Sequence, residues 1–312
     1  MKLTVASSPH IRGDFRTSRL MLDVVISLLP ALLVGTLKLG IRTLAVTGAS
    51  MGAAILAEWA WSLLLKKRNT LPDCSALVTG MLLALTLPVT CPVWVAVIGS
   101  VFAIVVIKLM CGGLGQNIFN PALAARALLV LVFPVALTRY AEVDAVASAT
   151  PLHHMVMPAL PEESILDMFL GNCPGSIGEI SALALLLGGV YLVARKVISA
   201  RIPLAYLGTV ALVTLVFHKT DNALAWMAYS LFSGGVMLGA IFMATDYATS
   251  PVTKLGQILY GIGCGVLTVI FRYYGLFPEG VTYAILLMNL LTWVLDRYTP
   301  PRRFGTGKGG TA

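Results

Sequence analysis

The residues best suited to chemistry lie in the polar stretch 144–152, which reads Asp-Ala-Val-Ala-Ser-Ala-Thr-Pro-Leu. Its small residues, among them Ser148, leave the hydroxyl of Thr150 open to approach, and Pro151 disfavours helix at that threonine. Formation of a phosphoester bond requires an uncrowded hydroxyl of this kind on flexible backbone. Asp144 could help to recruit a metal ion or a modifying enzyme. On the residues alone, the alternative is a plain polar turn before a proline.

Histidines and cysteines do not form a convincing metal site in the sequence. His153 and His154 are neighbours whose side chains point in different directions, so we expect surface loop histidines, although His153 could lie near a cofactor bound at Thr150. The five cysteines are odd in number and form no Cys-x-x-Cys pair, which argues against a disulfide framework or a zinc site. We interpret them as apolar filling residues, with Cys111 as a candidate redox ligand.

Six ionisable residues lie in or beside apolar segments, where charge is costly and usually functional, and three of them are hard to explain by position alone. Arg126 could meet the phosphate of a bound cofactor or pair with an acid. Asp246 and Glu58 are candidates for a cation path, although Glu58 lies beside Trp59 and could instead be at the membrane interface. Three others lie near expected helix ends, where snorkelling to the interface explains them: Asp23, Lys108 and Asp296.

The composition requires lipid as a solvent for much of this chain. Hydrophobic residues make up 58% of the 312 residues and charged residues 12%, about half the charged share of a soluble domain. A single globular core of this length cannot bury so much apolar surface. The net charge of +8 does not indicate nucleic-acid binding, because the basic residues form no patch interleaved with aromatic side chains. We therefore predict an integral membrane protein that does not bind nucleic acid.

Ten apolar segments predict an all-α polytopic fold with about ten transmembrane helices. The first apolar run begins at Leu20 without a clear cleavage site after it, so we expect a retained helix and not a signal peptide. The segments cover residues 20–37, 43–65, 75–90, 93–110, 121–138, 179–194, 203–217, 222–244, 255–271 and 281–296.

Basic residues predict the orientation of these helices. With both termini in the cytoplasm, 16 of the 22 lysines and arginines lie in cytoplasmic segments, and Arg272 is among the few in outer loops. This arrangement places Thr150 in an extracytoplasmic loop, the longest in the chain. The expected parts are a cytoplasmic segment 1–19, a first helix group 20–138, the outer loop 139–178, a second helix group 179–297 and a cytoplasmic tail 298–312.

Two short stretches of the sequence resemble each other weakly, which is compatible with an internal repeat containing broken helices. Gly112-Gly-Leu-Gly-Gln-Asn-Ile-Phe119 is similar to Gly234-Gly-Val-Met-Leu-Gly-Ala-Ile-Phe242. Each glycine pair leads to Ile-Phe and then to a polar patch. The alternative is that the glycines simply permit close packing of helices.

Several ordered motifs resemble the RnfD family of Rnf complex subunits, which is related to NqrB of the sodium-pumping NADH:quinone reductase. The resemblance covers nearly the whole chain. It rests on the stretch 144–152 together with Ser7–His10, Thr245–Thr253, Gly256–Gly261, Phe277–Val281 and Tyr283–Asn289.

The resemblance implies that Thr150 bears FMN through a phosphoester bond, attached from FAD by a flavin transferase on the outer side of the membrane. In that family the acceptor lies in a Ser-Gly-Ala-Thr type of motif. This sequence departs from it, with Ala147 where serine or threonine is usual and Ser148 where glycine is usual. The resemblance also allows a second, non-covalent flavin, riboflavin, between the helices.

The implied function is electron transfer in a bacterial inner-membrane complex that couples ferredoxin:NAD⁺ oxidoreduction to movement of Na⁺ or H⁺. The implied partners are the membrane proteins RnfA and RnfE, the flavoprotein RnfG and the soluble proteins RnfB and RnfC. No glycine pattern of a nucleotide site follows an expected strand, so other subunits would oxidise ferredoxin or NADH, and this chain has no catalytic residues of its own. The rival hypotheses are a secondary transporter or channel without flavin, and a passive scaffold.

Overall fold

The computed structural model describes residues 17–66, 70–138, 164–173, 175–275 and 280–300, and within these ranges the chain is helical without a β-strand. Two long helices begin the first group and shorter elements complete it. They are α1 (Thr17–Leu39), α2 (Arg42–Leu64), η1 (Leu71–Asp73), α3 (Ser75–Leu85), α4 (Val93–Phe102), its π-helical continuation η2 (Ala103–Leu109), α5 (Pro121–Val132) and α6 (Pro134–Thr138).

The second group follows the short helix α8 (Ile165–Leu170). It ends in two long helices, which pack against each other. Its elements are α9 (Ala182–Ala194), α10 (Arg201–Val216), α11 (Ala223–Phe232), α12 (Val236–Leu238), the π-helix η3 (Gly239–Met243), α13 (Lys254–Tyr274) and α14 (Val281–Tyr298).

Local chemistry determines where several of these helices begin. The side chain of Asn120 accepts hydrogen bonds from the backbone N–H groups of Ala122 (3.1 Å) and Leu123 (3.3 Å), and Pro121 occupies the first helical position of α5. Side-chain oxygens cap four other helices in the same way: Ser164 for α8, Ser181 for α9, Asn222 for α11 and Thr253 for α13. These caps satisfy N–H groups that lipid could not.

The helices support a multi-pass membrane protein, as predicted. Helices α1, α2 and α13 are each long and apolar enough to cross a bilayer. Helix α11 with α12 and η3 forms a further candidate span that is bent by 63°. Five apolar elements of 10–17 residues accompany them in the described ranges: α3, α4 with η2, α5, α9 and α10.

Three predicted segments are shorter or broken, and the breaks have local causes. The segment 75–90 is helical only to Leu85, ahead of Pro88, and the segment 121–138 is interrupted at Phe133 because Pro134 cannot donate a backbone hydrogen bond. Within the segment 222–244, helix α11 ends at Phe232 and a new helix, α12, begins after it. Gly234, at φ +63°, takes the left-handed conformation that this break requires.

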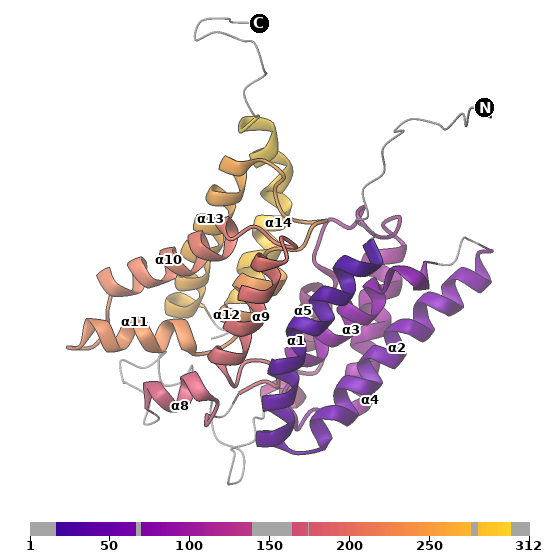
Figure 1. Ribbon diagram of the computed structural model, residues 1–312, viewed down its shortest axis with the longest axis horizontal. Coiled ribbons are helices and arrows are strands. Elements are labelled where there is room, and N and C mark those ends of the chain that lie inside the picture. The colour runs from indigo at the N-terminus through magenta and orange to yellow at the C-terminus, as the bar shows by residue number, and fades with distance from the viewer. Residues whose placement is uncertain (1–16, 67–69, 139–163, 174, 276–279, 301–312) are drawn as a thin grey trace, which may run out of the picture.

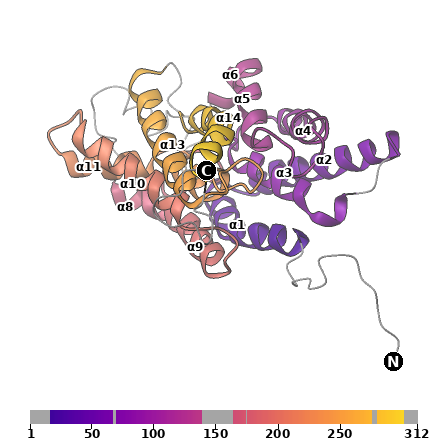
Figure 2. The same ribbon diagram turned by 90° about the horizontal axis from the view of Figure 1, so that it is seen from above.

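The two helix groups lie side by side (Figure 1 and Figure 2). The first group, coloured indigo to magenta, occupies one side of the molecule, and α10 to α14, coloured orange to yellow, occupy the other. Helix α9 packs on α1, and α14 packs on α5, so both pairs join the groups. The broken elements α3, α12 and η3 are almost completely buried between these long helices.

Candidate functional site

The flavin attachment motif lies outside the described residues. Thr150, Ser148, Asp144 and His153 all fall in the range 139–163, so their predicted roles stay predictions. The described chain resumes at Ser164, whose hydroxyl caps α8 and donates to Asp167 (2.7 Å). This hydrogen bond is the main reason that the pKa of Asp167 is lowered.

Arg126 lies buried on α5 and reaches the end of the broken helix α3. Its Nη1 donates to the backbone carbonyl of Thr86, the residue that follows α3, and lies 4.0 Å from Oε1 of Glu179. The segment before Glu179 also binds this helix end, since the N–H of Gly178 donates to the carbonyl of Leu85 (2.7 Å). We expected Arg126 to meet either a phosphate or an acid, and the structure shows the acid, Glu179.

Glu179 connects this helix end to the second broken element. A Cβ atom placed on Gly235 would lie 2.6 Å from Oε1 of Glu179, so the carboxylate sits directly against the glycine that precedes α12. A cation at the C-terminal end of one helix and an anion at the N-terminal end of another both match the helix dipoles. The pair Arg126–Glu179 thus stabilises the ends of two broken helices from opposite groups.

Arg272 makes the corresponding contact in the second group. It belongs to the last turn of α13, and its guanidinium donates to the carbonyls of Ser230 (2.5 Å) and Ser233 (2.7 Å) at the C-terminal end of α11. The prediction that Arg272 lies in an outer loop was wrong, because the side chain is only 5% exposed. The hydrophobic pattern around Arg272 contains no signal that distinguishes an arginine that caps another helix from an arginine in a loop.

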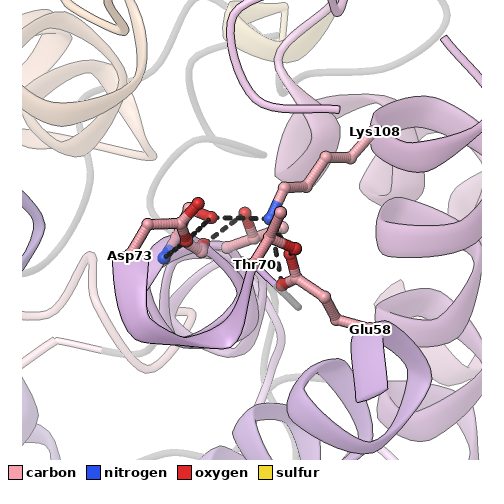
Figure 3. Close-up of polar contacts among 6 residues, drawn as sticks. Glu58, Thr70, Asp73 and Lys108 are labelled. Carbon is pink, nitrogen blue, oxygen red and sulfur yellow. Dashed lines mark hydrogen bonds and ion pairs between the residues drawn. The ribbon is translucent and has the colours of Figure 1, made fainter. Parts of the chain in front are cut away.

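A buried ion pair lies at the other end of α3 (Figure 3). The ammonium group of Lys108 donates to Oε1 (2.9 Å) and Oε2 (3.0 Å) of Glu58, and both side chains are at most 2% exposed. Lys108 also donates to Ser75 (2.6 Å), whose hydroxyl donates to Asp73 (2.6 Å). Thr70 donates to Glu58 (2.5 Å), which completes the network.

This network corrects two expectations. Lys108 does not snorkel to the interface, and Glu58 does not lie there beside Trp59, because each charge neutralises the other inside the helix group. The residues are 50 positions apart, on α2 and η2, so no local pattern in the sequence indicates that they meet. Burying both charges is tolerable only because the hydrogen bonds around them are also satisfied.

A small cavity adjoins this network, with a volume of about 70 Å³. It lies where α3 and α5 begin, and Met21, Leu192 and Phe242 provide part of its apolar wall. Seven polar residues line it: Ser75, Thr79, Lys108, Asn117, Asn120, Thr245 and Asp246. Polar residues follow each of the two similar glycine motifs: Asn120 after the first, and Thr245 and Asp246 after the second. These residues face one cavity, and the side chain of Asn120 donates to the carbonyl of Met243 (3.2 Å).

The glycines of the two similar motifs are nevertheless not equivalent in structure. Gly112, Gly113 and Gly115 form a turn after η2, all at positive φ, whereas Gly234 and Gly235 form the break between α11 and α12. The clearer parallel between the groups is a broken helix whose end receives a buried arginine. Sequence reasoning missed this parallel, because each arginine is far along the chain from the helix that it caps.

Asp246 is half-buried at the cavity wall. Its carboxylate accepts from the N–H of Ala248 (3.5 Å) and the hydroxyl of Thr249 (3.3 Å), which is a local turn. Asp296 instead caps the start of α13, where it accepts from the backbone of Val252 and Thr253. The described residues contain no group of three or more histidine, cysteine or acidic side chains that could hold a metal ion.

Comparison with known proteins shows similarity along almost the whole chain. The sequence profile of the NQR2, RnfD, RnfE family matches residues 4–305. In Acetobacterium woodii, the subunit designated D of the Na(+)-translocating ferredoxin:NAD(+) oxidoreductase complex is 48% identical over 99% of this chain and 97% of its own length. The corresponding subunit of the proton-translocating complex of Clostridium ljungdahlii is 41% identical, over 97% of this chain and 96% of its own. Its counterpart in the ion-translocating oxidoreductase complex of Stutzerimonas stutzeri is 37% identical, over 94% and 93%.

Proposed function

Because the chain belongs to the NQR2, RnfD, RnfE family, we propose that it is a membrane subunit of an ion-translocating ferredoxin:NAD⁺ oxidoreductase. One observation carries this proposal: the similarity to the corresponding subunit of such a complex extends over 99% of the chain at 48% identity. The subunit acts within the complex and not alone. Its proposed partners are the membrane proteins RnfA and RnfE, the flavoprotein RnfG and the soluble proteins RnfB and RnfC.

We propose that its own contribution is electron transfer through FMN bound covalently to Thr150. Support comes from the motif Ala149-Thr150-Pro151, from the small residues before it and from the family of the chain. The flavin supplies the redox chemistry, while the chain supplies its position and electrostatic surroundings.

The attachment is tested on a denaturing gel of the complex, co-expressed with a flavin transferase. The subunit band should fluoresce under ultraviolet light, and Thr150→Val should abolish the fluorescence without affecting membrane insertion. Ser148→Ala is the matched control, because it removes a neighbouring hydroxyl and should leave the band fluorescent. A dark wild-type band would favour the rival transporter or channel without flavin. Normal electron transfer by the Thr150→Val complex would favour a scaffold.

We propose that the cavity between α3, α5 and η3 binds one edge of a second, non-covalent flavin. Its wall combines the apolar side chains that pack on a ring with the amides of Asn117 and Asn120, which can bond the polar edge of an isoalloxazine. Riboflavin carries no phosphate, which fits a cavity whose nearest cation, Lys108, is already paired with Glu58. We expect Asn117→Leu to lower the flavin released on denaturation while the fluorescence at Thr150 stays. Unchanged release would place this flavin elsewhere.

Movement of Na⁺ or H⁺ is proposed from the same family relationship. The names of the relatives specify sodium in one case and protons in another, so the ion is an experimental question. Asp246 and Glu58 are the proposed path residues, and both lie beside the cavity or the network next to it. Uptake into vesicles containing the Asp246→Asn complex, measured with and without Na⁺, tests the role of this carboxylate.

A further inference from the structure

A groove runs between α9 and α10, two consecutive helices that do not pack closely on each other. Helix α9 packs on α1 and α10 packs on α13, and the six residues 195–200 join the two helices. The space between them has a volume of about 400 Å³. Its lining is apolar and includes Gly189, Val190, Val193, Leu204, Leu207 and Ile241.

The groove is open towards lipid and ends on a broken helix. Val190 and Leu204 are 67% and 69% exposed, so its rim faces outward from the helix groups. Its floor is formed where α9 meets η3, and a Cβ atom on Gly189 would lie 2.8 Å from Cγ2 of Ile241. Whatever fills the groove therefore touches the element that also borders the proposed flavin cavity.

Cationic side chains gather at one end of this groove. Arg195, Lys196 and Arg201 are exposed in the α9–α10 connection, and their neighbours Ala194, Ile198 and Ala200 line the groove. Arg195 contacts Asp23 (3.4 Å), and Arg201 shares the side-chain oxygen of Gln257 with Ser199. Among the described residues, Lys196 forms no ion pair. The end of the groove thus carries an excess of positive charge at the connection between the two helices.

We propose that this groove binds one anionic phospholipid, with an acyl chain along Val190 and Leu204 and the phosphate group at Lys196 and Arg201. The apolar lining of the groove excludes a polar ligand from its interior, whereas the adjacent cations attract an acidic head group. Guanidinium and ammonium groups bind phosphate oxygens through strong, charge-assisted hydrogen bonds. The bound chain would support Ile241 and so hold η3 in place. This site is independent of the proposed electron transfer.

The test uses the whole complex, purified in mild detergent and supplied with phosphatidylglycerol or phosphatidylcholine. Native mass spectrometry should show phosphatidylglycerol retained in preference to phosphatidylcholine. Two neutralised cations, Lys196→Gln with Arg201→Gln, should weaken retention roughly thirtyfold. Leu204→Trp fills the groove and should remove both lipids. Lys66→Gln is the matched control, because it neutralises an exposed lysine beyond the end of α2 and should change nothing.

A photo-crosslinking residue at position 204 identifies the occupant directly. Adducts with lipid are expected in the assembled complex. Adducts with another subunit would overturn the proposal, because a protein helix would then fill the groove. Equal retention of the two lipids, or retention that survives neutralisation of Lys196 and Arg201, would also overturn it. None of these outcomes depends on whether Thr150 carries FMN, so a failure of either proposal can be recognised separately.

Discussion

Among single residues, the pairing of Glu58 with Lys108 shows how two charged side chains can be buried inside a helical membrane protein. Glu58 receives three hydrogen bonds, two from Lys108 and one from Thr70. The proposed role of Glu58 in cation movement needs this pair to open, because a carboxylate that is fully bonded has little capacity for an ion. Lys108 also donates to Ser75, which in turn donates to Asp73, so the ammonium group keeps one oxygen partner if the contact with Glu58 opens.

Removing one member of this pair should be worse than removing both. Glu58→Gln or Lys108→Met leaves an uncompensated buried charge and should lower the free energy of unfolding by roughly 3–5 kcal/mol. The double variant leaves no net charge, so we expect it to recover much of that loss. Thermal unfolding of the four proteins in detergent provides the measurement. If the double variant loses the sum of the two single losses, the side chains do not act as a pair.

Among the helices, the packing of α1 on α9 depends on a glycine. A Cβ atom on Gly188 would collide with the backbone carbonyl of Ser27 and approach the ring of Phe242 (3.0 Å). A backbone carbonyl cannot move aside as a flexible side chain can. Gly188 therefore sets the distance between one helix from each group, and the position of η3 behind them.

We expect Gly188→Ala to separate α1 from α9. Overpacking against backbone should cost about 1–3 kcal/mol, and the altered position of Phe242 should reduce flavin retention in the cavity. The control is Gly208→Ala on α10, where an added Cβ meets no atom within 4 Å. Alanine should there stabilise the helix by up to about 1 kcal/mol. Thermal midpoints in detergent compare the two variants, and equal midpoints would contradict the argument.

The broken helices depend on donors from other helices. The carbonyl groups at the ends of α3 and α11 would be costly in an apolar interior, and Arg126 and Arg272 supply donors to them. Each group of helices thus contains one interrupted helix capped by a buried arginine. A small pocket does lie at the junction of the two interruptions, where Thr86, Arg126, Glu179 and Gly235 line it.

For the molecule as a whole, the distribution of charge predicts the orientation in the membrane. We expect fluorescent protein fused after the C-terminus to fluoresce, because this domain folds in the cytoplasm. Alkaline phosphatase inserted in the predicted outer loop 139–178, near Thr150, should be active, because it folds only outside. Fusion after Lys66 serves as a cytoplasmic control on the first group. An active phosphatase at the C-terminus would reverse the orientation and place Thr150 in the cytoplasm.

The composition and the lengths of the apolar segments were sufficient to predict that lipid surrounds much of the chain, that the fold is helical and where most of the helical segments approximately lie. They suffice because lipid demands internally bonded backbone, and only continuous helices meet that demand from local residues. The ordered motifs also indicated the family, which the match over residues 4–305 confirmed.

Which charges meet depends on the tertiary structure alone. Lys108 finds Glu58 from 50 positions away, Arg126 reaches Thr86 across 40 positions, and Arg272 reaches Ser230 across 42. These contacts depend on how whole helices pack, and that packing has no local periodic signal. Pro88 and Gly234 mark the breaks after α3 and within α11–η3 in the sequence, but which distant side chains satisfy the broken ends is decided by the packing of whole helices.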